Sequence, residues 1–122
     1  NEPLSSLMSS TRDKCLTPTT RKQNAAMFDG DVHKVPKRAL TMGVGTILRA
    51  RELILLATGS AKAAIIAKAV EGPITSMVSA SAIQLHPNCK VVVDETAASM
   101  LTGREYYDFV FNIEPEWVEF RD

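Results

Sequence analysis

The sequence predicts an α/β domain built on a parallel sheet. Apolar runs that resemble strands alternate with segments that resemble helices, and turn-forming residues separate them. Two of these runs, Glu52–Thr58 and Lys90–Val93, are rich in branched apolar residues, which is typical of strands buried on both faces. The chain has 122 residues, 45% of them apolar, which is enough for one hydrophobic core and too little for two.

The first part of the chain, to about Arg38, is polar and loop-rich, with seven basic and four acidic residues. Within it, Thr17 is a good helix cap and Pro18 fits a first helical turn, so we expect a helix from there to about Phe28, ended by Asp29-Gly30-Asp31. After Pro36 the short apolar run Ala39–Thr41 predicts a buried strand.

The middle of the chain predicts the helices that cover the sheet. The longest is expected from Ser60 to Glu71, mostly buried and closed by Gly72-Pro73. Shorter helices are expected at Ile47–Ala50, Ala80–Leu85 and Ala97–Leu101, the last of them capped by Asp94-Glu95-Thr96.

The final segment, residues 104–122, differs in character and is expected to form an acidic, aromatic tail to a domain spanning residues 1–103. It has two basic and six acidic residues and most of the aromatic side chains. The run Tyr107–Phe111 predicts an edge strand, and Trp117 is expected to anchor the tail.

Charge and composition exclude several classes of protein. The 14 basic and 14 acidic residues balance, which argues against binding to nucleic acid or a membrane surface. No apolar run approaches the roughly 20 residues that span a bilayer. Cys15 and Cys89 lie far apart without further ligands, so neither a disulfide scaffold nor a metal site is expected. We expect a soluble, unexported protein of the reducing cytoplasm.

One segment combines the features of an anion site. At Thr58–Lys62 a strand ends, Gly59 allows close approach to the backbone, and Lys62 stands in the first helical turn, which together predict a phosphate cradle. An ordinary strand–helix turn with a solvated lysine explains the same residues, and spacing alone leaves both readings open.

Other candidate groups favour structural roles. Carboxylates such as Asp94 and Glu95 suit a helix start without any ligand. His33 and His86 have no partner at ligand or triad spacing, so each is expected to be packed or solvated. Gly43-Val44-Gly45 lacks the third glycine of a dinucleotide fingerprint.

Three stretches closely resemble the glucosamine-6-phosphate deaminase family, in register over roughly residues 1–100. They are Asn1–Arg12, Val35–Thr46, and Gln84–Pro87 followed by Val93–Glu95. The resemblance implies a Rossmann-like parallel sheet with flanking helices and an enzyme of hydrolase or isomerase type, commonly homo-oligomeric. Such enzymes convert glucosamine 6-phosphate to fructose 6-phosphate and ammonia in N-acetylglucosamine degradation, without a cofactor. Family chains are about twice this length, so we expect the C-terminal part of the larger domain.

The resemblance also implies roles for two residues of a divided active site. Of the family motif Asp-Gly-His-Ile-Ala-Phe-Asn-Glu-Pro, only Asn1, Glu2 and Pro3 stand here. The counterpart of Glu2 assists a histidine in opening the sugar ring, and Lys62 matches the lysine that binds the substrate phosphate. The histidine and the aspartate that abstracts the C2 proton are absent, so this chain alone is expected to be inactive.

A second site is implied for regulated members. Ser5, Arg12 and Lys14 match positions that bind N-acetylglucosamine 6-phosphate as an allosteric effector, although a basic arm in solvent remains an alternative. Cys15 stands where those members have threonine. Ala26 replaces the family arginine that grips the phosphate, and alanine makes no such charge-assisted contact.

Three hypotheses therefore remain. The chain is the C-terminal part of a deaminase, acting in a homo-oligomer or with a complementing N-terminal segment. Alternatively, it is a non-catalytic module that senses a sugar phosphate on the same fold, or a fragment with a scaffold role only.

Overall fold

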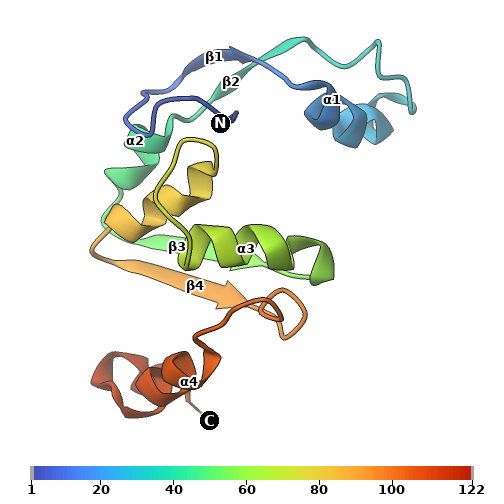
Figure 1. Ribbon diagram of the computed structural model, residues 1–122. Helices are drawn as coiled ribbons and strands as arrows, with labels where there is room; N and C mark the ends of the chain where they lie inside the picture. The colour runs from blue at the N-terminus through green and yellow to red at the C-terminus, as the bar shows by residue number, and fades with distance from the viewer. Residues whose placement is uncertain (1, 122) are drawn as a thin grey trace.

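The computed structural model describes residues 2–121 and has an α/β architecture (Figure 1). Asn1 lies outside the described residues, so the structure does not place that part of the deaminase-like motif. The helices and strands are, in order, β1 (Arg12–Cys15), α1 (Pro18–Asn24), β2 (Arg38–Thr41), α2 (Val44–Leu48), β3 (Leu53–Ala57), α3 (Ala63–Val70), β4 (Cys89–Val93) and α4 (Arg104–Ile113). Short 3-10 helices lie at Ala25–Phe28, Ser60–Lys62, Ser79–Leu85 and Pro115–Phe120.

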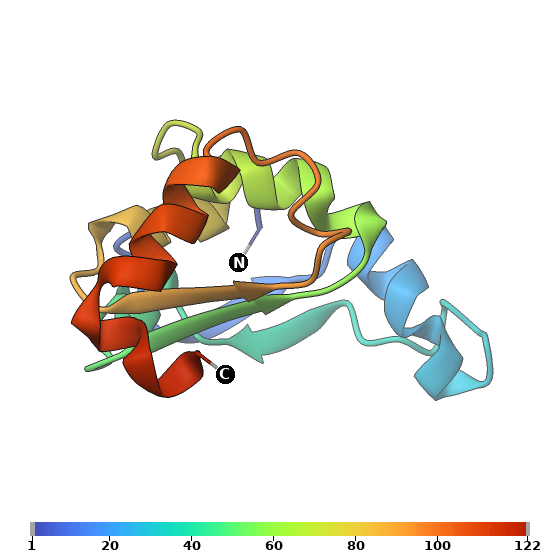
Figure 2. The same cartoon turned by 90° about the horizontal axis from the view of Figure 1, so that it is seen from below.

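The parallel sheet is confirmed, with β3 and β4 as its two strands. They pair in register from Leu53 opposite Cys89 to Ala57 opposite Val93. The connection between them contains α3 and the 3-10 helix Ser79–Leu85, which pack against each other. Figures 1 and 2 show α3 running along the sheet, so this part of the chain is a parallel crossover unit with a helix covering one face.

The prediction that the two strands are buried on both faces is wrong for this chain. Side chains alternate between the faces of a strand. Ile54, Leu56 and Val92 point to one face and are 67%, 68% and 49% exposed. The apolar core lies on the other side, where Ala63, Ile66 and Ala69 of α3 are buried. Within residues 2–121 this second face is therefore partly open, although Lys90 on the same face is half-buried near Glu116 and Glu119.

A separate antiparallel ribbon, formed by β1 and β2, precedes the parallel sheet. It pairs Arg12 with Thr41 and Cys15 with Arg38, and β1 was not expected from the sequence. The strand predicted at Ala39–Thr41 is present, but its predicted burial is wrong, because Leu40 is 82% exposed. One face of this ribbon is exposed in both strands, where Asp13 and Cys15 lie opposite Leu40 and Arg38.

Two glycines fasten the N-terminal segment to α2, which begins earlier than the helix expected at Ile47–Ala50. A Cβ atom on Gly43 would lie 2.0 Å from the carbonyl oxygen of Ser9, and one on Gly45 would lie 2.6 Å from the backbone of Met8. In addition, the Val44 amide donates to Ser9 Oγ at 3.3 Å. Gly43-Val44-Gly45 is therefore a close-packing motif in this fold.

The helix predicted after Thr17 is confirmed. Thr17 Oγ1 accepts a hydrogen bond from the Thr20 amide at 3.2 Å, and α1 passes into a 3-10 helix that ends at Phe28. Asp29 then adopts a left-handed conformation with φ of 56°. This region extends away from the parallel sheet (Figures 1 and 2).

Two predictions for the C-terminal part are wrong. The expected helix at Ala97–Leu101 is a series of turns, and the expected edge strand at Tyr107–Phe111 lies inside helix α4. Over the longer window Tyr106, Phe109, Val110 and Ile113 recur at helical spacing, which outweighs the short alternation. Helix α4 packs mainly against Pro115–Phe120, where the Trp117 ring lies 6.0 Å from Phe111 and 5.9 Å from Phe120.

The helices of residues 2–121 are all too short or too polar to cross a bilayer.

Candidate functional site

Lys62 stands at the carboxyl end of the parallel sheet. Strand β3 ends at Ala57, and Gly59 follows with φ of 88°, a backbone conformation that L side chains rarely adopt. The Gly59 carbonyl accepts the Lys62 amide at 3.0 Å, which forms the turn that leads into α3. The Lys62 side chain is exposed and has no ion pair or hydrogen bond within residues 2–121. It is therefore available to an anion at the edge where open α/β sheets bind ligands.

Asp94 holds the same turn from the neighbouring strand. Its Oδ2 atom accepts the Gly59 amide at 3.0 Å, while Oδ1 accepts the Ala97 amide at 2.7 Å and the Thr96 hydroxyl at 2.9 Å. The Ala97 amide, then that of Gly59, hold the pKa of the Asp94 carboxyl below its usual range. The expected structural role of Asp94 is confirmed, but the residues directly after it form turns where a helix was expected. Asp94 also accepts a hydrogen bond from the distant Gly59.

Glu2 and Ser5 lie in a tight turn beside the loop that follows α3. The Glu2 carbonyl accepts the Ser5 amide at 3.1 Å, and the Leu4 amide donates to the Ser76 carbonyl at 3.0 Å. Ser5 is buried, and its hydroxyl has no hydrogen-bond partner. No hydrogen bond or ion pair joins the described side chains of Glu2 and Lys62. The structure therefore does not connect the two predicted substrate residues directly.

The other two residues of the predicted effector site share one face of β1. Arg12 and Lys14 are two positions apart and both half-buried, so they point to the same side of the strand. The Arg12 guanidinium donates to the Ser10 carbonyl at 3.4 Å. Since Ser5 Oγ has no partner, neither cation is hydrogen-bonded to that hydroxyl.

The two positions that depart from the deaminase pattern differ in their surroundings. Ala26 lies exposed in the 3-10 helix after α1. Because alanine carries no charge, this position offers no cation to a phosphate. Cys15 lies on the face of β1 opposite Arg12 and Lys14, where its sulfur accepts a hydrogen bond from Arg38 at 3.1 Å. Arg38 also forms an ion pair with Asp13.

The two histidines are structural or solvated, as predicted. His86 Nδ1 accepts the Asn88 amide at 3.1 Å, so its other ring nitrogen carries the proton that is shared with the Ala50 carbonyl at 2.8 Å. His33 is exposed.

Sequence reasoning missed a carboxylate that binds the segment before α4. Glu71, just after α3, accepts the Thr102 and Gly103 amides at 2.9 Å and the Tyr107 hydroxyl at 2.9 Å. The Thr102 amide, followed by that of Gly103, lowers the pKa of Glu71 to about 2. The partners are more than 30 residues away in sequence, so no local pattern could reveal this contact.

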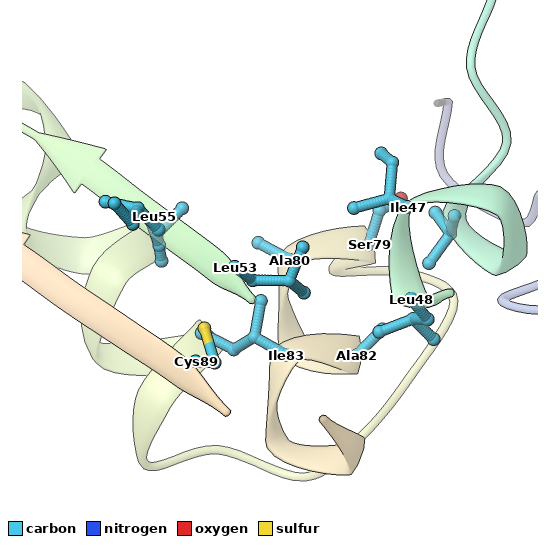
Figure 3. Close-up of a pocket in the computed structure, with 11 residues that line it drawn as sticks. Ile47, Leu48, Leu53, Leu55, Ser79, Ala80, Ala82, Ile83 and Cys89 are labelled. Carbon is cyan, nitrogen blue, oxygen red and sulfur yellow. The ribbon is translucent and has the colours of Figure 1, made fainter. Parts of the chain in front are cut away.

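An apolar cavity of about 280 Å³ lies between α2, β3 and the 3-10 helix Ser79–Leu85 (Figure 3). Its lining includes Ile47, Leu53, Leu55 and Ile83, and contains no charged side chain. Burying a phosphate there without a partner would be costly, so this cavity does not compete with the Lys62 turn as a phosphate site.

Comparison with known proteins identifies relatives of the whole chain. No family model matches. Glucosamine-6-phosphate deaminases of Streptomyces coelicolor and Streptomyces avermitilis are each 52% identical over 117 residues, which is 96% of this chain and 45% of theirs. The deaminase of Bifidobacterium longum is 47% identical over the same length. The chain thus spans about 45% of the length of the curated relatives it matches.

A solved structure supports the same relationship. It is described as a monomeric glucosamine-6-phosphate deaminase and a missing link of the NagB superfamily. It superimposes with a TM-score of 0.75 at 41% identity, over 81% of this chain and 41% of that one. The α/β fold of this chain is therefore similar to part of the fold of that deaminase. Since 117 of the 122 residues are matched in the curated relatives, the similarity also includes part of segment 104–122.

Proposed function

We propose that this chain, which is homologous over 96% of its length to glucosamine-6-phosphate deaminases, forms the phosphate-binding part of such an enzyme. The reaction would convert glucosamine 6-phosphate and water to fructose 6-phosphate and ammonia. The names of the relatives describe a deaminase and lend no support to a hydrolase. The observation that carries the proposal is the Lys62 ammonium, which has no ion pair or hydrogen bond within residues 2–121 and follows the carboxyl end of β3, on a turn that the positive φ of Gly59 makes possible.

Lys62 would bind the phosphate of the substrate. An ammonium group without a competing carboxylate offers its full charge to a dianionic phosphate ester. A Cβ atom at Gly59 would meet no other atom within 4 Å, so the space beside the turn is open to a ligand.

Glu2 would assist in opening the pyranose ring. Ring opening moves a proton from the anomeric hydroxyl to the ring oxygen, and a base must then take the C2 proton to form an enolamine. Return of a proton to C1 converts the enolamine to a C2 imine, and water hydrolyses this imine to the ketone and ammonia. A carboxylate beside a histidine stabilises the imidazolium and fixes its tautomer. The histidine and the C2 base would come from the rest of the enzyme, so we expect no ammonia release from this chain alone.

The open sheet face is a surface for that remaining part. Parallel sheets are covered on both faces, yet Ile54, Leu56 and Val92 are exposed. We propose that a complementing segment of the deaminase fold covers them. A copy of this chain on that face would instead appear as a homodimer in analytical ultracentrifugation, and would contradict this assignment.

A thermal-shift titration tests the substrate proposal. Glucosamine 6-phosphate and fructose 6-phosphate should raise the melting temperature in a saturable way, because a ligand that binds only the folded state stabilises it. The shift should disappear in Lys62→Ala. Lys68→Ala provides the matched control, since Lys68 is an exposed lysine on α3 without a predicted role. Equal shifts in both variants would contradict the proposal, as would the lack of any shift in the unaltered chain.

A sensor module is the second candidate, favoured by one observation. Ala26 leaves the family arginine position without a cation. A sensor would bind the sugar phosphates and remain inactive after a complementing deaminase segment is added. An enzyme would release ammonia under that condition, and Ala26→Arg should then lower the KM.

The effector proposal concerns the face of β1 that carries Arg12 and Lys14. N-acetylglucosamine 6-phosphate should bind there in addition to the substrate site, with buried Ser5 as a further contact. Lys14→Ala should weaken this binding and leave the Lys62-dependent shift unchanged. Loss of both together would contradict a separate effector site.

A further inference from the structure

We infer that Asp94 is a positioning residue for the phosphate turn: its carboxylate holds Gly59 so that Lys62 faces the ligand. The inference rests on the proposed role of Lys62. Asp94 follows the end of β4, and Gly59 lies two residues beyond the end of β3, so the parallel register places them at the same sheet edge.

A continuous chain of hydrogen bonds connects Asp94 to Lys62. Asp94 Oδ2 accepts the Gly59 amide at 3.0 Å, and the Gly59 carbonyl accepts the Lys62 amide at 3.0 Å. Gly59 is therefore held at both its backbone polar groups. Its φ of 88° lies in a region that glycine adopts without strain and that L side chains rarely adopt, so the turn needs glycine here and the two hydrogen bonds orient it.

The carboxylate itself is held in place by two further donors. Oδ1 accepts the Ala97 amide at 2.7 Å and the Thr96 hydroxyl at 2.9 Å. Both carboxylate oxygens of Asp94 thus accept hydrogen bonds from the protein. In addition, the negative charge of Asp94 would repel a phosphate dianion. Asp94 is consequently not a ligand of the sugar phosphate, and its contribution to binding acts through the turn.

The direction in which Asp94→Asn changes the affinity for the sugar phosphate distinguishes a positioning role of Asp94 from a purely electrostatic one. In Asp94→Asn the amide oxygen can still accept from Ala97 and Thr96, but an NH₂ group then faces the Gly59 amide, so two donors oppose each other. Removal of a negative charge near a phosphate site should tighten binding by electrostatics alone. Loss of positioning should weaken it, by about tenfold for one charge-assisted hydrogen bond.

The experiment uses the whole chain, labelled with ¹⁵N, and measures two quantities by NMR. The first is the rate of hydrogen exchange at the Gly59 and Lys62 amides without ligand. The second is the affinity for glucosamine 6-phosphate, measured at a temperature well below the melting temperature. Asp94→Asn is compared with Glu95→Gln, which removes the neighbouring charge of an 82% exposed side chain and leaves the turn untouched. Thr96→Val removes one donor to Asp94 and serves as the milder variant if Asp94→Asn does not fold.

The expected result for Asp94→Asn is faster exchange at Gly59 and Lys62 together with weaker binding. Glu95→Gln should show neither faster exchange nor weaker binding. Thr96→Val should show a smaller effect in the same direction. A structural role limited to stability would lower the melting temperature without changing the affinity of the folded protein, and would overturn the inference. Tighter binding or unchanged exchange in Asp94→Asn would overturn it too. If the unaltered chain does not bind the sugar phosphate, the proposed function fails, and amide exchange alone decides whether Asp94 holds the turn.

Discussion

The N-terminal region, residues 2–50, and the C-terminal region, residues 51–121, are held together by different physical means. In the first, Gly43 and Gly45 let the backbone of residues 8–10 lie directly against α2. In the second, Asp94 and Glu71 accept backbone amides from segments far away in the sequence, and so fix both ends of the loop between β4 and α4.

This difference has a practical consequence for stability. A steric contact between backbones has no titratable group, so it is insensitive to pH, but a single added methyl group disrupts it. A carboxylate that accepts amide hydrogen bonds can adjust to small displacements of the backbone, but protonation of the carboxylate weakens these hydrogen bonds. The two regions should therefore respond to opposite kinds of perturbation.

The largest effect is expected from Gly43→Ala. The new Cβ atom would lie 2.0 Å from the Ser9 carbonyl oxygen, so the N-terminal segment must shift away from α2. We expect a loss of about 3 kcal/mol in the free energy of unfolding, measured by urea denaturation. Gly30→Ala is the control, because its Cβ meets no atom within 4 Å and only its positive φ opposes the change. Equal losses in the two variants would show that the close contact is unimportant.

Glu71→Gln should have the next largest effect, confined to the C-terminal region. Glutamine keeps one accepting oxygen but loses the charge that both amides and the Tyr107 hydroxyl share. Hydrogen exchange at the Thr102 and Gly103 amides should accelerate by about tenfold, while exchange in β1 and β2 should not change. Glu105→Gln on α4 removes a charge without breaking this contact and should leave those amides protected.

Acidification should weaken the C-terminal region selectively. The pKa of Glu71 is lowered from 4.5 to about 2 in the folded chain, so its contribution to stability is complete above pH 4.5 and is lost as the pH falls towards 2. The lowered pKa of Asp94 acts in the same direction. Melting temperatures measured across this range should fall less steeply in Glu71→Gln than in the unaltered chain. A parallel decline would refute the role of Glu71, and Gly43→Ala should retain the full slope.

The smallest effect on stability is expected from Lys62→Ala. Although Lys62 lies in the C-terminal region, its side chain contributes no hydrogen bond or ion pair within residues 2–121. Without ligand, the free energy of unfolding should change by no more than about 0.5 kcal/mol. A larger loss would mean that Lys62 supports the turn itself, and that its proposed function as a ligand for phosphate needs revision.

Features with local causes were predictable from the sequence. The Thr17 cap and Pro18 start α1, and the branched runs form β3 and β4 as expected, because these determinants act within a few residues. The succession of a strand, a glycine and a lysine made Lys62 a candidate, but it left an ordinary turn open as well, and the family resemblance favoured the phosphate role. Two of the three stretches that carry the family resemblance, Asn1–Arg12 and Val35–Thr46, include the close contact between residues 8–10 and Gly43.

Features that depend on distant partners were not predictable. Asp94 appeared to start a helix, but its oxygen atoms also bind Gly59, 35 residues away, and the following residues form turns. Tyr107 to Phe111 alternate like a strand over five residues, yet the longer pattern and the contact with Glu71 produce helix α4.

By itself, the sequence determined the α/β class, the two parallel strands and the position of the candidate phosphate lysine, because hydrophobic patterns and turn residues act locally. Only the tertiary structure decided which face of the sheet is covered, which amides Asp94 and Glu71 bind, and that no hydrogen bond or ion pair joins Glu2 and Lys62. The physical reason is that burial and hydrogen bonding depend on which segments meet in space. The sequence does not reveal whether a given carboxylate faces water or accepts a hydrogen bond from a distant amide.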